Sequence, residues 1–132
     1  MARNAPGAGR VTPRTPAIDG LSSRANAAVQ ALRPRIGDVG GALRTYRREI
    51  RQAGRWIDLA GQCPSPSCDI SIQRDILEAA LHALPRDAAR ELRRLVAALD
   101  EEFLRKTLPD PWAATRGPRH TRAWWRQRLE DR

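Results

Sequence analysis

The stretch that decides the fold is RIGDVGGALRTYRREIRQAGRWIDLA, residues 35–60. Its apolar side chains are separated alternately by three and four residues, which is the repeat of a helix that buries one face. This set, called the apolar seam below, consists of Ile36, Val39, Leu43, Tyr46, Ile50, Ala53, Ile57 and Ala60. The pattern predicts a helix over about 38–60, firm from near Gly41 because glycines weaken its first turn. Gly61 follows, where a left-handed C-cap is expected.

Further helices are expected on both sides of the seam, over about 19–32, 70–84 and 86–107. The first has Asp19 or Ser22 available as N-cap, and Pro34 is expected to end it. The last begins after Pro85, since the first turn of a helix tolerates proline. The apolar face expected for the helix over 70–84 consists of Ile72, Ile76, Leu77, Ala80, Ala83 and Leu84. No segment shows the two-residue alternation of a strand.

These segments predict an all-α fold, a three- or four-helix antiparallel bundle. A chain of 132 residues is long enough for one domain, which we assign to residues 18–108. Residues 1–17 are rich in proline, glycine and arginine and are expected to form a disordered basic arm. Residues 109–132 are expected to form an irregular Pro/Arg/Trp tail, with room for a short terminal helix in AWWRQRLEDR.

The charge of the chain is strongly positive. Lys and Arg number 24 against 15 Asp and Glu, a net charge of +9, and Lys106 is the only lysine. This balance favours an anionic partner: nucleic acid first, an acidic protein or membrane surface less often. The alternative is a basic surface without a specific partner. No apolar run is long enough to cross a membrane, and the N-terminus lacks the apolar core of a secretory signal. We therefore expect a cytoplasmic protein without a membrane partner.

The arginines of the seam helix gather on one side. On a helical wheel Arg44, Arg48, Arg51 and Arg55 fall within about 60° of one another, with Arg47 nearby, and they point away from the seam. Guanidinium groups bind phosphate through two parallel hydrogen bonds. Such a row predicts salt-sensitive, sequence-tolerant binding of nucleic acid. The alternative is an ordinary solvated face.

Aromatic and basic residues also alternate near the end of the chain. Trp124 and Trp125 lie between Arg122 and Arg126, and such a combination is able to stack on bases and hold phosphate. In a second interpretation the tryptophans fold back and cover the apolar face of the bundle. In a third, the segment docks as a short motif in a groove of a partner.

Both cysteines, Cys63 and Cys68, lie in the segment CPSPSC. Their spacing fits half of a zinc site, but no second Cys/His pair exists. The remaining candidate ligands are His82 and His120, with Asp69 as a further option. A disulfide is disfavoured in the cytoplasm, and a regulatory thiol before a helix N-terminus is another option. The favoured interpretation is a stiff connector between two antiparallel helices.

The residues give little sign of catalysis. Asp75, Glu78 and His82 share one helical face, which suits acid–base or metal chemistry, but an ordinary solvated face is the favoured interpretation. No phosphate loop, serine-nucleophile motif or metal-helix signature is present. We expect a small, basic, non-catalytic protein that binds nucleic acid and needs no cofactor.

Two other functions stay open at this point. The first is a protein–protein adaptor or regulatory subunit, in which the seam pairs with a protein partner or forms a homodimer. The residues of that contact would be Ile36, Val39, Leu43, Tyr46, Ile50 and Ile57. The second is a small zinc-stabilised module, which would depend on Cys63 and Cys68.

Overall fold

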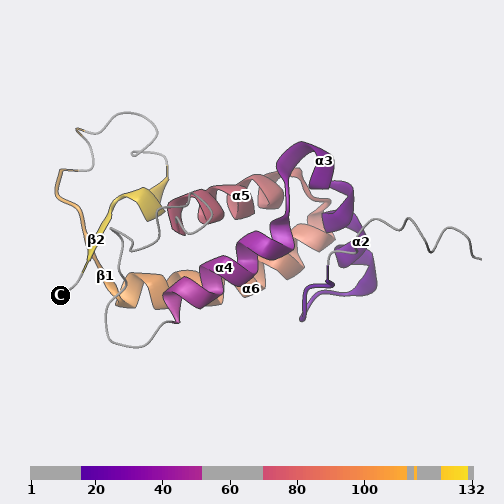
Figure 1. Ribbon diagram of the computed structural model, residues 1–132, viewed down its shortest axis with the longest axis horizontal. Coiled ribbons are helices and arrows are strands. Elements are labelled where there is room, and N and C mark those ends of the chain that lie inside the picture. The colour runs from indigo at the N-terminus through magenta and orange to yellow at the C-terminus, as the bar shows by residue number, and fades with distance from the viewer. Residues whose placement is uncertain (1–15, 52–69, 113–114, 116–122, 131–132) are drawn as a thin grey trace, which may run out of the picture.

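The computed structural model describes residues 16–51, 70–112, 115 and 123–130. Its helices are α2 (Ser23–Ala31), α3 (Arg33–Ile36), α4 (Val39–Ile50), α5 (Ile70–Ala83) and α6 (Arg86–Arg105). The shorter elements are the strands β1 (Thr107–Pro109) and β2 (Arg128–Glu130) and the 3-10 turn η3 (Trp124–Arg126). Helices α4, α5 and α6 lie lengthwise beside one another, with α5 antiparallel to the other two (Figure 1). The predicted all-α bundle is confirmed.

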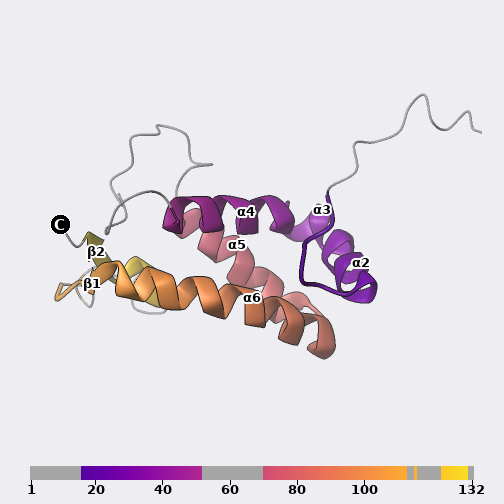
Figure 2. The same cartoon turned by 90° about the horizontal axis from the view of Figure 1, so that it is seen from below.

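The bundle has two distinct ends and two distinct sides. Helices α2 and α3 pack at one end, and the two short strands lie at the other (Figure 1). Viewed after a quarter turn, α4 runs along one side of the bundle and α6 along the other (Figure 2).

Helix α4 begins at an aspartate cap. The carboxylate of Asp38 accepts a hydrogen bond from the backbone N–H of Gly41 at 2.9 Å, which satisfies one unpaired donor of the first turn. A Cβ atom at Gly41 would collide with that carboxylate, so the glycine makes room for the cap. The helix ends at Ile50, with Arg51 as its C-cap. The predicted extension to residue 60 and the Gly61 cap lie outside the described residues.

The apolar seam forms the centre of the core. Val39, Leu43, Tyr46 and Ile50 are buried, and Ile36 is partly buried against them. Helices α5 and α6 both contact α4, so these residues are covered by their own chain. A protein partner or homodimer that used this part of the seam would have to open the bundle. The remaining seam residues, Ala53, Ile57 and Ala60, are among the undescribed ones.

The first predicted helix, over about 19–32, is the shorter α2, and a short helix α3 that was not predicted follows it. Ser22 caps α2 by accepting from the backbone N–H of Ala25 at 3.1 Å. Its own backbone N–H and hydroxyl donate to Glu91 of α6, at 2.7 and 3.0 Å, and so attach α2 to the bundle. Helix α2 ends at Ala31, before Pro34, as predicted. Pro34 itself lies in the first turn of α3, where the missing N–H of proline breaks no helical hydrogen bond.

Helices α5 and α6 follow the predicted ranges closely. Pro85 lies between them as the N-cap of α6, in agreement with the prediction. The buried side of α6 consists of Ala88, Ala89, Leu92, Val96, Leu99 and Phe103. The buried side of α5 consists of Ile70, Gln73, Arg74, Leu77, Ala80 and Leu81. It therefore includes two polar residues and is rotated from the face that the sequence predicted.

The short strands correct the expectation of a strand-free chain with an irregular tail. β1 and β2 pair antiparallel, with Leu108 opposite Leu129. The side chain of Arg128 reinforces the pairing, since its guanidinium donates to the hydroxyl and the carbonyl oxygen of Thr107, both at 2.9 Å. Three-residue strands are too short for alternation to show in sequence. The predicted basic arm falls outside the described residues, except for residues 16 and 17.

Candidate nucleic-acid interface

The predicted arginine row lies on the solvent side of α4. We call Arg44, Arg47, Arg48 and Arg51 the arginine face. The side chains of Arg44, Arg48 and Arg51 are 51%, 66% and 53% exposed, and Arg47 is partly exposed. The opposite side of α4 is locked in the core, so its packing fixes the direction in which the row points. Arg55, the fifth predicted member, lies outside the described residues.

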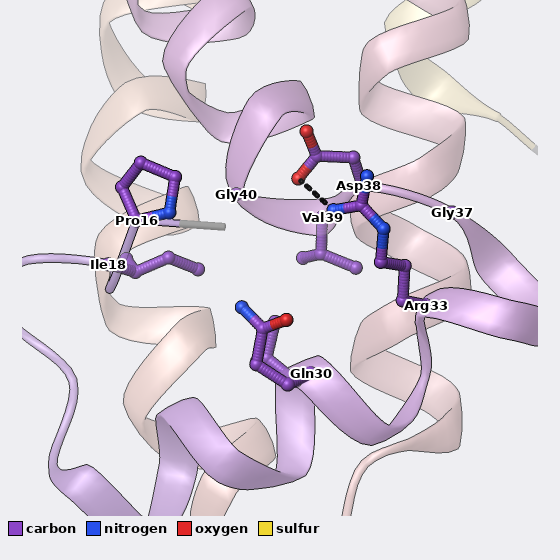
Figure 3. Close-up of a pocket in the computed structure, with 9 residues that line it drawn as sticks. Pro16, Ile18, Gln30, Arg33, Gly37, Asp38, Val39 and Gly40 are labelled. Carbon is purple, nitrogen blue, oxygen red and sulfur yellow. Dashed lines mark ion pairs between the residues drawn. The ribbon is translucent and has the colours of Figure 1, made fainter. Parts of the chain in front are cut away.

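One carboxylate serves two arginines at the beginning of the arginine face. Arg33 and Arg44 both approach Asp38, with N···O distances of 3.9 Å, and Figure 3 shows the contact from Arg33. The pocket drawn there lies between α2 and the start of α4, and Arg33 is the only cation in its lining. Because Arg33 already forms an ion pair with Asp38, we assign no ligand to this pocket.

At the far end of the arginine face, one carboxylate again contacts two cations. Glu102 of α6 accepts from Arg51 at 3.3 Å and also lies 3.9 Å from Lys106. Between the two ends, Arg48 lies 3.6 Å from Glu49. Among the described residues, the arginine face with its two flanking cations, Arg33 and Lys106, therefore places six positive charges against the three carboxylates that contact them. This described part of the surface around α4 carries more positive than negative charge.

The arginine with the most internal contacts is one that sequence reasoning did not select. Arg74 of α5 is only 4% exposed. Its guanidinium binds Asp100 of α6 through two parallel contacts, Nε–Oδ1 at 3.0 Å and Nη2–Oδ2 at 2.9 Å. A third nitrogen donates to Glu78 at 2.9 Å. The hydroxyl of Tyr46 donates to the same Asp100 at 2.6 Å. The cluster thus joins α4, α5 and α6 through side chains.

The charges of this cluster are held in one state. Burial raises the pKa of Tyr46, and the neighbouring Asp100 carboxylate raises it further, so the phenol stays neutral. Burial alone would lower the pKa of Arg74, but the hydrogen bonds and charge of Asp100 raise it above its ordinary value. A neutral phenol and a permanent cation, each already hydrogen-bonded, are poor proton donors and acceptors at neutral pH. We interpret the cluster as a structural junction.

The C-terminal tryptophans close this junction. Trp125 is buried and lies over the guanidinium of Arg74, 4.4 Å from carbon Cζ to the ring centroid. Its indole N–H donates to Asp75 at 2.8 Å, and Arg126 forms an ion pair with the same carboxylate. Trp124 packs beside Phe103, with 5.7 Å between ring centroids.

Of the interpretations open for these aromatics, the structure therefore shows the one in which they cover the bundle. Trp124, Trp125 and Arg126, selected from the sequence as nucleic-acid contacts, are used inside the fold. Arg122, the fourth residue of that group, lies outside the described residues. Bases could stack on Trp124 and Trp125 only if η3 moved away from Arg74.

The metal candidates are not brought together in the part of the chain that the structure describes. His82 is exposed on α5 and its Nε2 lies 2.8 Å from Glu78. No group of three potential metal ligands forms within residues 16–51, 70–112, 115 and 123–130. Cys63 and Cys68 lie outside those ranges. No helix among the described residues is long and apolar enough to span a membrane.

Comparison with known proteins gives no further information. No family model matches the chain, and no curated protein or solved structure matches it either.

Proposed function

We propose that this protein is a small, non-catalytic, cytoplasmic protein that binds double-stranded nucleic acid through the arginine face of α4. The observation that carries the proposal is the charge excess on a fixed helix. Three arginines of α4 and its C-cap Arg51 lie on one side, and the other side is buried. Two of the nearby carboxylates, Asp38 and Glu102, are each shared by two cations. Guanidinium groups on such a helix suit phosphate. The helix itself is already fixed by its packing, so binding costs mainly the conformational entropy of the arginine side chains.

The length of the row suits a phosphate backbone. Arg44 and Arg51 are seven residues apart, which is about 10 Å along a helix. A duplex carries one negative charge for about every 1.7 Å of its axis. The arginine face therefore meets several phosphates at once, and each contact adds to affinity without reading sequence.

The aromatic residues favour a duplex over a single strand. Proteins that bind single strands usually add aromatic side chains on which bases stack. Tyr46, the aromatic residue of α4, is buried, and Trp124 and Trp125 pack against Arg74. Among the described residues, these three side chains therefore offer no stacking surface beside the arginine face, and phosphate contacts of this kind are typical of backbone recognition in duplexes.

Fluorescence anisotropy with a mixed-sequence duplex and the matching single strand tests the proposal. Four arginines that each meet one phosphate predict an affinity loss of about 100-fold between about 50 and 200 mM salt. The variant Arg44→Glu/Arg48→Glu/Arg51→Glu should lose binding at both concentrations, and the duplex should bind more tightly than the single strand.

A charge-matched control separates the arginine face from net charge. Arg24, Arg86 and Arg105 are exposed on α2 and at the two ends of α6, and their combined change to glutamate alters net charge equally. This control should keep most of the affinity. Absence of binding at low salt, or equal losses in the two triple variants, would contradict the proposal. Tighter binding of the single strand would overturn the duplex assignment.

A further inference from the structure

The outer side of α6 carries a second row of arginines. Arg86, Arg90 and Arg93 are separated by four and three residues, so they fall within about 60° of one another on the helix, and Arg94 lies beside them. All four are exposed, and the side chain of Arg90 is 66% exposed. The opposite side of α6 is buried in the core, so its packing fixes the direction in which this set points. We call these four arginines the α6 row.

The α6 row holds more positive than negative charge. Residues 86–98 contain its four arginines and two carboxylates, those of Asp87 and Glu91. The carboxylate of Asp87 is 3.9 Å from the guanidinium of Arg90, and its side chain is 82% exposed, so water and salt weaken this pair. Glu91 is already bound, since it accepts from the backbone N–H and the hydroxyl of Ser22 at 2.7 and 3.0 Å. The row therefore keeps positive charge available to an anionic partner.

The second half of α6 is closer to balance. Glu101 and Arg105 are both exposed and lie one turn apart, where opposite charges attract each other. Glu102 contacts both Arg51 and Lys106. The positive excess on the outer side of α6 therefore lies in its first half, on the α6 row.

The α6 row and the arginine face of α4 point in different directions. Arg51 of the arginine face contacts Glu102, so this edge of α6 lies beside the arginine face. Arg90 and Arg93 precede Glu102 by 12 and 9 residues, which places them about 120° and 180° round the helix from it. Helix α4 runs along one side of the bundle and α6 along the other (Figure 2). A straight duplex bound to the arginine face therefore leaves the α6 row free.

We infer that the α6 row binds the phosphate backbone of a second duplex, so that one molecule of this protein bridges two duplexes. The inference rests on the proposed function, because the arginine face has to hold the first duplex. Phosphate suits the α6 row for the same reasons as on α4. The guanidinium groups are exposed on a fixed helix, and Arg86 and Arg93 are about 10 Å apart along its axis, a length that meets several phosphates.

The α6 row is the weaker of the two sites. It carries four arginines against two carboxylates, whereas the arginine face with its flanking cations carries six positive charges against three. Copies that lie along one long duplex present several α6 rows at once, and their weak contacts to a second duplex add up. Bridging should therefore need duplexes several times longer than one binding site, and the α6 row should add little to the binding of one short duplex.

Capture of a labelled long duplex by beads that carry an unlabelled long duplex measures bridging. The wild type should capture the labelled duplex. Capture should fall more steeply with salt than the anisotropy signal of one short duplex, because phosphates of two duplexes are neutralised. The variant Arg90→Glu/Arg93→Glu should lose capture and still bind the short duplex nearly as the wild type does. The matched control Arg24→Glu/Arg105→Glu alters net charge equally and should keep both properties.

The outcomes separate this inference from the proposed function. A wild type that binds the short duplex without capturing the long one overturns bridging alone, and a wild type that binds neither overturns both. Equal losses of capture in the two double variants would overturn the assignment to the α6 row.

A protein–protein contact is the other way to join two duplexes. Sedimentation equilibrium of the wild type without nucleic acid should show a monomer, and a dimer that Arg90→Glu/Arg93→Glu abolishes would overturn the inference. Circular dichroism should show unchanged helix content in both double variants, since all four substituted positions are exposed.

Discussion

Arg74 and the arginines of the arginine face are the same residue type in opposite environments, one buried and the others on the surface. Arg74 is almost fully buried, donates to two carboxylates and lies against Trp125. Arg44, Arg48 and Arg51 are about half exposed, and the carboxylates near them are shared or outnumbered. The arginines of this chain therefore have two roles. The guanidinium of Arg74 holds helices together, and the arginine face leaves positive charge on the surface.

The two settings have different energetic consequences. Removal of one partner from a buried ion pair leaves the other charge without compensation in a poorly solvated site, which is strongly destabilising. An exposed pair gains little because water and salt weaken it. Stability should therefore depend on the Arg74 cluster, and binding on the arginine face.

The substitution Arg74→Ala should give the largest loss of stability. Asp100 would lose both of its arginine contacts and Trp125 the cation beneath it, so the free energy of unfolding should fall by about 3–5 kcal/mol. Urea denaturation followed by circular dichroism measures this loss. Arg48→Ala is the matched control and should change stability by about 0.5 kcal/mol or less. Equal effects of the two substitutions would remove the distinction drawn between the two settings.

Trp125→Ala should have the next largest effect. A buried tryptophan replaced by alanine leaves a cavity, and the expected loss is about 3 kcal/mol. The indole contact to Asp75 is lost as well. Thermal unfolding is the measurement, with Trp112→Ala as control because Trp112 is 65% exposed. A small effect at Trp125 would show that η3 adds little to the bundle.

Tyr46→Phe should reduce stability by a smaller amount. The ring stays in the core, and only the hydrogen bond to the Asp100 carboxylate is removed. Hydrogen bonds to charged groups are worth about 2 kcal/mol. Urea denaturation should show this decrease in the free energy of unfolding, and the slope of that free energy against urea concentration should be unchanged. In the Arg74→Ala background the cost of Tyr46→Phe should differ from its cost in the wild type, because both groups share Asp100.

Acidification should produce the smallest effect. Desolvation disfavours the charged form of Glu78, but hydrogen bonds and charge from Arg74, together with His82, outweigh it and hold the pKa of Glu78 below 4.5. Its stabilising contribution is therefore complete above the unfolded pKa and is lost as the pH falls through the lowered folded pKa. Glu78→Gln should flatten the decrease in unfolding free energy between about pH 5 and 3. Parallel curves for wild type and variant would contradict this assignment.

Local signals explain what the sequence predicted correctly. The spacing of Val39, Leu43, Tyr46 and Ile50 identifies α4 and the side that it buries, and the exposure of the arginine face follows from the same wheel. Ser22 and Pro85 mark helix beginnings because capping depends on a few neighbouring residues.

The signals that failed were long-range ones. Arg74 occupies a buried position, but its partners Asp100 and Tyr46 lie 26 and 28 positions away in sequence, and no local pattern connects them. A face defined by apolar residues alone omits Arg74, and the predicted face of α5 therefore included Ile72 and Ile76, which the structure leaves partly exposed. The contact between Arg51 and Glu102, which are 51 positions apart, was hidden for the same reason.

The closure of the Arg74 cluster by Trp125 also sets an order for folding during synthesis. Helices α4, α5 and α6 leave the ribosome before residues 123–130 do. Until then the guanidinium of Arg74 has its carboxylates but no aromatic cover, and Asp75 lacks the indole and guanidinium that it later binds. We therefore expect the docking of Trp124 and Trp125 at the β1 end to be a late folding step, because it joins residues that are distant in sequence.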